Sequence, residues 1–314
     1  MQSKLIKQYL RVMAIILMVS ACNEQYSGVG EEATSKNSTS QSSKSYSSAG
    51  AMRWSTNGLG NTGLNVHLSE EILAELNPSE YVNDLNPIQQ MLEQWNSAVS
   101  TKTLFNISAA SDTSTLNEGQ KADLLDYNDN VFGIYRHDTW FPDVSSSALA
   151  ITQFFGKRVN VGTDYEYLEL IHADIIVNYK NFTFGISNKS LDDYDLSSVI
   201  LHELGHFLGL GHSGYYDDSV MVPYLDVGTE KREILNYDMD SISNLYESER
   251  STSAVVVTSA LTTGKSTNKE SKPKAEIVQG IIELQASGKC NHYIDGKLVH
   301  QHKKKPGQFR PGLQ

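Results

Sequence analysis

The sequence predicts an α+β domain in which helices pack against a twisted, mixed β-sheet. Two kinds of apolar pattern lead to this prediction. Short stretches that are apolar throughout or alternate with polar residues are typical of strands, whereas apolar residues at three- and four-residue steps are typical of amphipathic helices. Strands are expected near residues 64–68, 104–109, 131–135, 148–155 and 173–178.

Three helices are expected, and each has its own signal. The first covers about residues 83–99, with Asn83 or Asn86 as its N-cap. The second begins at Asp195, because a carboxylate at this position can accept hydrogen bonds from the unpaired amides of the first turn. The third lies near 237–246, where apolar side chains share one face.

The N-terminus has the pattern of an export signal. Residues 1–21 combine basic residues with an apolar stretch at 12–19, which is too short to cross a bilayer because a helix needs about 20 residues for that. The sequence that ends at Cys22 resembles a bacterial lipobox, which implies lipid attachment to this thiol and a membrane anchor. An ordinary secretory signal is the alternative. Residues 22–50 are rich in serine and are interpreted as a tether.

The charge is distributed unevenly along the chain, which carries a net charge of −11. Residues 51–250, the predicted folded domain, contain 30 acidic and 11 basic side chains. An acidic surface argues against nucleic acid as the main partner, because phosphate binding requires basic groups. The simpler interpretation of this charge is that it keeps the domain soluble.

The last segment, residues 251–314, is basic and begins with a stretch rich in Ser, Thr and Lys. We expect it to be a disordered tail, although a short strand or helix is allowed at 277–286. The tail contains Cys290 and three histidines, at positions 292, 300 and 302. A metal-binding role for these histidines is one alternative, and a solvated tail is the expected one.

The residues that indicate chemistry lie in the second helix and just after it. His202 and His206 are four residues apart, so a helix places both imidazoles on one face, where they can bind one metal ion. Glu203 lies next to the first of them and can reach a water beside the metal without binding the metal itself. Gly209 can end the helix in a sharp turn that returns His212 as a third ligand.

Three imidazoles with an open fourth position are typical of a catalytic metal site rather than a structural one. Zinc fits this ligand set best, and other divalent ions are not excluded. With one catalytic Zn²⁺ on His202, His206 and His212, Glu203 is the expected general base. The alternative for each histidine alone is an ordinary core or surface histidine.

The whole string from His202 to His212 is the signature of the metzincin metalloproteases, and Ser213 with residues 194–199 resembles the matrixin branch. Residues 219–224 look like the matrixin Met-turn, which implies that Met221 forms a hydrophobic floor under the metal. Tyr224 follows the proline directly, unlike the family pattern, so it either lines a substrate wall or simply packs.

The resemblance covers about residues 52–248 and implies a zincin-like catalytic domain, with an antiparallel edge strand, an active-site helix and a C-terminal helix. By analogy, the strand at 148–155 is the sheet edge with which an extended peptide pairs. His137 and His172 do not reproduce the spacing of a second, structural zinc site, so only one zinc is predicted. No inhibitory cysteine motif precedes Trp54 after Cys22.

Taken together, these features predict a zinc-dependent endopeptidase that hydrolyses extracytoplasmic proteins or peptides. The alternative is a surface-tethered binding or adhesin lipoprotein that keeps the fold without turnover. We expect a monomer that is lipid-anchored at the cell envelope through Cys22. The sequence is compatible with bound calcium but assigns no residues to it.

Overall fold

A computed structural model describes residues 52–112, 115–116, 120–161, 166–186, 190, 192–214, 217–247, 277–287 and 289–303. All of them belong to one compact unit, residues 45–314. The predicted signal segment, Cys22 and the tether lie outside the described residues. Within the described ranges, no helix combines the length and the apolar character that crossing a bilayer requires.

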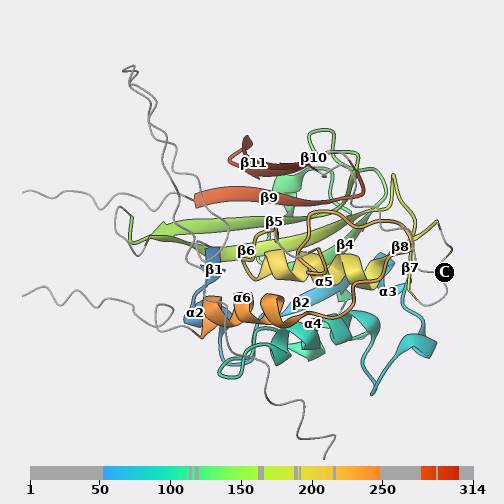
Figure 1. Cartoon of the computed structure of the whole chain (residues 1–314), viewed down its shortest axis with the longest axis horizontal. Helices are drawn as coiled ribbons and strands as arrows, with labels where there is room; N and C mark the ends of the chain where they lie inside the picture. The colour runs from blue at the N-terminus through green and yellow to red at the C-terminus, as the bar shows by residue number, and fades with distance from the viewer. Residues whose placement is uncertain are drawn as a thin grey trace, which may run out of the picture. The chain divides into compact units, whose positions relative to one another are not determined.

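A mixed β-sheet forms the centre of this unit (Figure 1). Its strands follow the order β11-β10-β9-β5-β6-β4-β2-β3, and β1 also pairs with β6. The strands are β1 (Met52–Trp54), β2 (Val66–Ser69), β3 (Thr115–Leu116), β4 (Phe132–His137), β5 (Ala148–Val159), β6 (Tyr167–Asn178), β9 (Ile277–Gln285), β10 (Lys289–Ile294) and β11 (Lys297–Lys303). Strands β1, β2, β3, β4 and β6 pair in parallel, whereas β5, β9, β10 and β11 form antiparallel pairs.

Three helices pack on the same side of the sheet (Figure 1). They are α4 (Pro87–Ser97), α5 (Leu196–Phe207) and α6 (Asn236–Tyr246). Short helices α2 (Thr56–Leu59) and α3 (Glu70–Leu73) and 3-10 turns fill the connections, and β7 (Phe184–Gly185) pairs with β8 (Tyr194–Asp195). The predicted α+β fold class is confirmed. Asn86, one of the two expected caps, begins α4 by accepting a hydrogen bond from the amide of Gln89.

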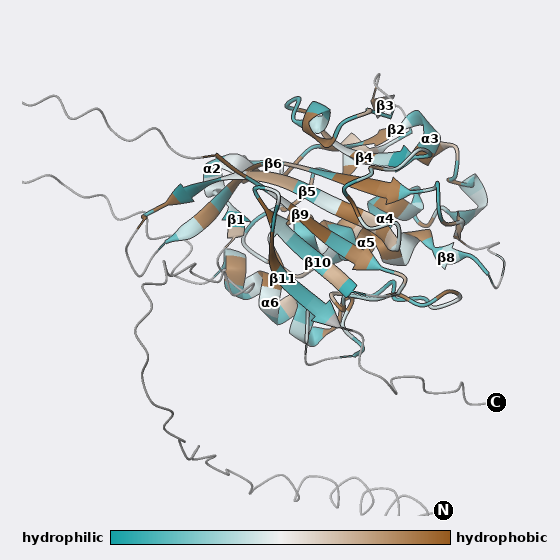
Figure 2. Ribbon diagram, turned by 90° about the horizontal axis from the view of Figure 1, so that it is seen from above, coloured by the Kyte–Doolittle hydropathy of each residue, from teal (hydrophilic) through white to brown (hydrophobic). Residues whose placement is uncertain are grey.

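Hydrophobic residues are frequent along the central strands (Figure 2), and their buried side chains form two clusters. Successive side chains of a strand point to opposite faces, so Ile175 packs toward the helices while Ile176 belongs to a second cluster on the other face. That second cluster has four aromatic residues among its nine buried members, including Tyr127 and Tyr135. Every residue of α5 is also buried, and the helix contacts both β5 and β6 of the sheet and α4.

One strand prediction was wrong. The segment near 104–109, predicted as a strand, makes a single bridge between Leu64 and Phe105 and then turns into a 3-10 helix at Ile107–Ala110. Its apolar residues are buried as expected, but Ala109 and Ala110 pack as part of a turn. A short apolar run in the sequence does not distinguish a buried strand from a buried helical turn.

The prediction of a disordered tail was wrong over residues 289–303, which form β10 and β11, whereas β9 lies within 277–286, where a short strand or helix was allowed. β9 forms because Val278, Ile282 and Leu284 share one face of the strand and join the main core. Gly280 leaves room for Phe154 of β5, whose ring would lie 2.0 Å from a β-carbon at this glycine. Residues 251–276 and 304–314 lie outside the described residues.

The strand at 148–155, expected at the sheet edge, is not an edge in this structure. β5 pairs with β6 on one side and with β9 on the other, from Ala148 opposite Gln285 to Lys157 opposite Ile277. The antiparallel edge strand is β11 instead. The C-terminal strands therefore extend the sheet beyond the strand that was expected to receive a peptide.

We predict that Trp54→Phe lowers the free energy of unfolding by about 1–3 kcal/mol, because it leaves a buried carbonyl without a donor. The indole Nε1 of Trp54 donates to the carbonyl of Phe207 at 2.7 Å, at the end of α5. Urea denaturation measures the effect. Trp140→Phe is the matched control, since its indole donates to the partly buried carbonyl of Ser145 away from this helix. Equal losses in the two variants would contradict a special role for the helix end.

Candidate active site and metal centre

The start of α5 is fixed by Asp195, the predicted N-cap. Its Oδ1 accepts a hydrogen bond from the amide of Ser198 at 2.8 Å, and Arg232 forms an ion pair with the same carboxylate. Burial alone would raise the pKa of Asp195, but the hydrogen bonds from Arg232 and Ser198 hold it below its ordinary value. The helix that carries the chemical residues therefore begins at a charged anchor inside the domain.

The three histidines predicted as metal ligands come together. His202 and His206 lie on one face of α5, and the turn after the helix returns His212 to them. The Nε2 atom of His212 lies 3.2 Å from that of His202 and 3.0 Å from that of His206. Three ring nitrogens thus converge on one point inside the protein.

Each of these rings is oriented by a partner at its other nitrogen. The Nδ1 of His202 lies 2.6 Å from the carbonyl of Val220, and the Nδ1 of His206 lies 2.8 Å from the carbonyl of Leu210. The Nδ1 of His212 lies 2.8 Å from a ring nitrogen of another histidine, discussed below. When Nδ1 donates its proton in this way, the Nε2 lone pair remains free to bind a metal.

Burial favours the neutral form of these imidazoles. It lowers the pKa of His202 to about 3 and lowers the pKa values of His206 and His212 well below the ordinary value. Neutral imidazole is the form that binds metal. Three nitrogens around a tetrahedral zinc ion, each about 2.1 Å from it, would be about 3.4 Å apart. The observed separations are close to that value, so the residues present fit zinc.

Glu203 lies beside this point and is fully buried. Its Oε2 is 2.6 Å from the hydroxyl of Thr152 on β5, which donates to it. Its Oε1 is buried without a hydrogen-bond partner among the described residues. Burial raises the pKa of Glu203 to about 8, while the hydrogen bond from Thr152 acts in the opposite direction, and a nearby cation would also favour the ionised form. One oxygen is therefore held in place and the other is available to a water.

The turn after α5 requires Gly209. Its φ of +99° is disfavoured for other residues, and a β-carbon there would lie 2.2 Å from the carbonyl oxygen of Met52. The amide of Leu210 donates to the carbonyl of Gly205 at 2.9 Å, which closes the end of the helix. The next residues then lead directly to His212.

Met221 packs against α5 at Gly205, and its role as a hydrophobic floor stays a prediction. Its Sδ would be 2.3 Å from a β-carbon at Gly205, so glycine is what allows this close approach. The turn is held to the site by the amide of Ser213, which donates to the carbonyl of Met221 at 2.8 Å. It is held to α6 by Ser219, whose hydroxyl donates to Asp238 at 2.5 Å.

Tyr224, for which the sequence left two roles open, faces the C-terminal strands. Its hydroxyl donates to the carbonyl of His302 at 3.0 Å, and its backbone forms a parallel bridge with Gln285. The side chain is half-buried. These contacts neither assign it to a substrate wall nor exclude it from one.

The C-terminal strands bring residues to the metal centre that the sequence interpretation left in a tail. The Nε2 of His292 is the partner of His212 Nδ1 at 2.8 Å, and the Sγ of Cys290 lies 3.5 Å from the same nitrogen. His212, His292 and His302 form a second group whose atoms are close enough to hold an ion. The sequence signal for this group was a two-residue spacing, between Cys290 and His292 and between the other two histidines of the tail. Residues two apart in a strand share a face.

His137 and His172 do not join the histidines of the metal centre. His137 contacts the carbonyl of Lys121 at 2.9 Å, and His172 forms an ion pair with Asp174 at 2.6 Å. Neither belongs to a cluster of ligand atoms close enough to hold an ion within the described ranges.

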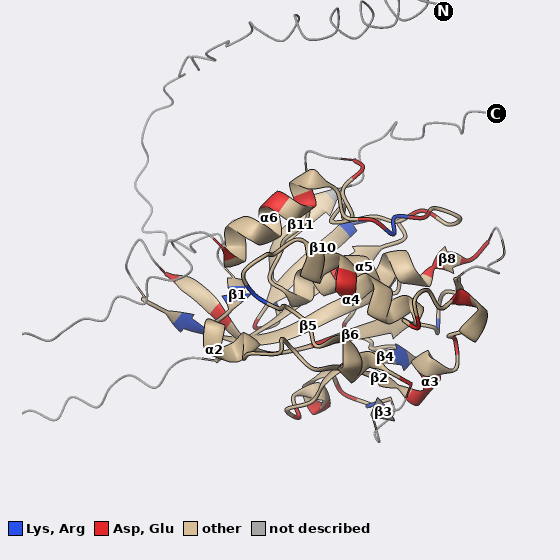
Figure 3. Cartoon of the chain, turned by 90° about the horizontal axis from the view of Figure 1, so that it is seen from below, with Lys and Arg blue, Asp and Glu red and all other residues tan. Residues whose placement is uncertain are grey.

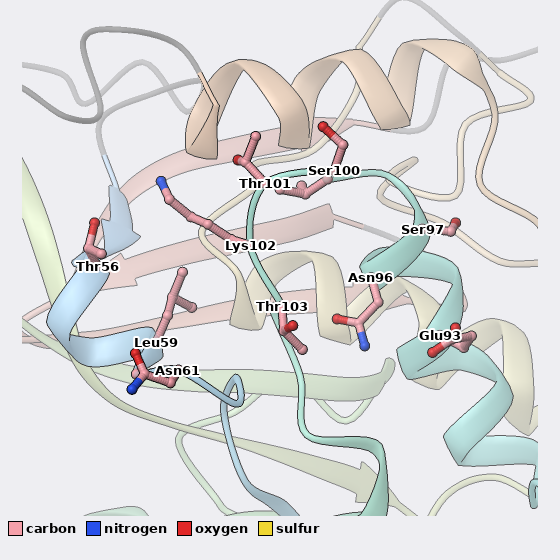
Figure 4. A pocket seen from close by; sticks show the side chains of 12 residues that line it. Thr56, Leu59, Asn61, Glu93, Asn96, Ser97, Ser100, Thr101, Lys102 and Thr103 are labelled. Atoms are coloured by element: carbon pink, nitrogen blue, oxygen red, sulfur yellow. The ribbon is translucent and has the colours of Figure 1, made fainter.

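A pocket of about 680 Å³ lies elsewhere, between α2, the end of α4 and the loop at 99–103 (Figure 4). Its lining is mostly polar and includes Asn96 and Lys102. None of the residues of the metal centre lines it. The pocket is therefore separate from the candidate active site.

Comparison with known proteins agrees with this geometry. Residues 141–247 match the family model Peptidase_M10, described as Matrixin. This part of the chain is similar to the matrixin metalloproteases. The matrixin match includes α5, the turn to His212, the Met-turn and α6, and it ends before β9. The family implies a catalytic zinc.

Similar sequences occur in plants. The chain is 46% identical over 52 residues to Metalloendoproteinase 2-MMP and, likewise, to Metalloendoproteinase 5-MMP, both of Arabidopsis thaliana. It is 43% identical over 53 residues to Metalloendoproteinase 1 of Glycine max. The matches cover 17% of this chain and 14%, 14% and 17% of these relatives. The likeness is thus confined to a short part of each protein.

We predict that Gly205→Ala lowers the free energy of unfolding by about 1–3 kcal/mol, because the added methyl group overpacks the contact with Met221 and Trp95. The substitution should also weaken zinc binding, because α5, which carries two of the metal ligands, must move away from Met221. Denaturation and competition with a zinc chelator measure the two effects. Gly214→Ala is the control, because a β-carbon there meets nothing within 4 Å. Unchanged stability and zinc affinity in Gly205→Ala would contradict this account of the floor.

Proposed function

We propose that this protein is a zinc-dependent endopeptidase in which His202, His206 and His212 hold the metal and Glu203 is the general base. The observation that carries the proposal is the convergence of three buried imidazole nitrogens beside a buried carboxylate, one oxygen of which has no partner among the described residues. Three protein ligands leave the fourth coordination position of a zinc ion open for water or substrate. The matrixin match over residues 141–247 supports the same assignment.

The bound zinc supplies Lewis-acid activation of water and of the scissile carbonyl. Glu203 takes a proton from the attacking water through Oε1 and passes it to the leaving amine. Thr152 keeps the other oxygen in place, so the carboxylate does not rotate away. Met221 and the backbone partners of the imidazoles hold the ligands in position.

Protein or peptide chains are the proposed substrates, and nucleic acid is not. Acidic residues lie on α6, on α3 and in the loop beside β8 (Figure 3), and they outnumber basic residues in the whole sequence, 37 to 26. A surface of this charge repels phosphate backbones. The relatives in Arabidopsis thaliana and Glycine max carry the name metalloendoproteinase, which supports a proteolytic role.

We further propose that the enzyme acts outside the cytoplasm as a monomer, lipid-anchored at the cell envelope through Cys22. This part of the proposal rests on the sequence of residues 1–50, with its basic start, short apolar stretch, lipobox-like cysteine and serine-rich continuation. Growth with a radiolabelled fatty acid tests it. Label in the wild type and none in Cys22→Ser is the expected result, and equal label in both would overturn the anchor.

We predict that Glu203→Gln lowers kcat/KM for a casein-derived peptide by about 10²–10⁴-fold while zinc remains bound, because the amide cannot accept the proton. Removing the metal with a chelator should abolish cleavage, and added zinc should restore it. Zinc content and hydrolysis are measured on the same preparations. Glu233→Gln, a change at an exposed carboxylate, is the control and should leave the rate unchanged. Full activity of Glu203→Gln, or of metal-free protein, would exclude this mechanism.

A further inference from the structure

We propose that the C-terminal segment, the three strands β9–β11, is an intramolecular inhibitor that occupies the substrate groove and must leave β5 before a protein substrate binds. The inference rests on the proposed peptidase function and concerns the regulation of the same site. Three sets of contacts lead to it, from β5, from the Met-turn and from the metal ligands.

The first set is the pairing of β9 with β5. The ladder runs from Gln285, opposite Ala148, to Ile277, opposite Lys157. It includes Thr152, the residue that holds Glu203, opposite Ile282. Addition of an extended chain to a strand edge is a common way of binding peptides. β9 therefore uses the backbone groups of β5 that a substrate chain would need beside the general base.

The second set holds β9 from the other side. The amide of Gln285 donates to the carbonyl of Pro223 at 3.1 Å, and the amide of Leu225 donates to the carbonyl of Gln285 at 3.2 Å. Gln285 is thus held between β5 and the segment that follows Met221. An extended chain bound on both sides by backbone groups occupies a groove in the way that a substrate does.

The third set reaches His212, one of the three proposed metal ligands. Cys290 and His292 of β10 contact Nδ1 of His212, and the ring of His302 lies 5.0 Å from the ring of His212. Glu203 is 0% exposed. Because hydrolysis requires a water and a peptide chain to reach the metal centre beside this carboxylate, a fully buried Glu203 is incompatible with substrate access in this arrangement.

The segment is joined to the matrixin domain in a way that permits it to leave. The matrixin match ends at residue 247, and β9 begins at Ile277. The intervening residues, 248–276, can span up to about 100 Å when extended. Contacts within the segment, such as Cys290 Sγ to the carbonyl of Glu283 at 3.0 Å, allow it to move as one body.

Val278→Asp in the full-length protein tests the inference. Val278 is 2% exposed, lies opposite Gly156 and is four ladder positions from Ile282, so the new charge weakens docking without touching the metal ligands. We expect kcat/KM for a quenched fluorescent peptide to rise at least tenfold. The matched control is Val299→Asp on β11, where the side chain is 49% exposed, and its kcat/KM should stay within twofold of wild type.

A disulfide provides a second test that does not depend on the folding of Val278→Asp. Lys157 and Ile277 are directly opposite at the end of the ladder, so Lys157→Cys with Ile277→Cys can close a bond between β5 and β9. The oxidised protein should lose at least tenfold in kcat/KM relative to the same protein after reduction. Lys157→Cys alone should not respond to oxidation.

The outcomes separate this inference from the proposed function. If the wild type cleaves the peptide, and neither Val278→Asp nor the closed disulfide changes kcat/KM, the segment is a permanent part of the sheet and the inference is wrong while the function stands. If no form cleaves the peptide with zinc bound, the proposed function fails and the inference fails with it. If Val278→Asp does not fold, the disulfide alone decides.

Discussion

The structure depends most on the hydrogen bonds that orient the three histidines of the metal centre, two of which lie in the fully buried helix α5. All residues of α5 are buried, and a helix of this kind would ordinarily be apolar throughout. Here His202, His206 and Glu203 introduce polar groups into the core, and each has a defined partner on a different element: the Met-turn, the segment after the helix, and β5. The ring orientation at the metal centre is therefore set by the tertiary fold, since the helix alone would leave the rings free to rotate.

The Met-turn, α6 and the start of α5 keep the histidine rings in this orientation. The Met-turn both supplies the carbonyl that orients His202 and places Met221 against Gly205, so one segment controls ring orientation and helix position together. Asp238 of α6 and Asp195 at the start of α5 hold that arrangement at its two ends. A polar site in a core of this density is stable only when nearly all of its atoms are paired. The unpaired Oε1 of Glu203 is the exception that the proposed chemistry uses.

Much of this could be predicted from sequence, because the responsible signals are local. The spacing of His202, His206 and Gly209 and the caps Asp195 and Asn86 act within a helix or its ends, and the structure has these features where the patterns indicate them. Thr152 could not be identified in this way, since its role arises only when β5 lies beside α5. The C-terminal strands, of which only a short element at 277–286 was allowed, could not be assigned for a related reason. Their alternating pattern is short and basic residues surround it, and its burial depends on pairing with β5, more than a hundred residues earlier in the chain.

The contact between His212 and His292 has a consequence for energetics. One imidazole offers Nε2 to the metal centre and Nδ1 to the C-terminal segment, so metal binding and docking of the segment share a side chain. Two binding events that share a group are linked, and the linkage is reciprocal: whatever factor the metal applies to the docking equilibrium, docking applies to the affinity for the metal. On this basis a single coupling free energy connects the zinc affinity of the site with the docking equilibrium of the C-terminal segment.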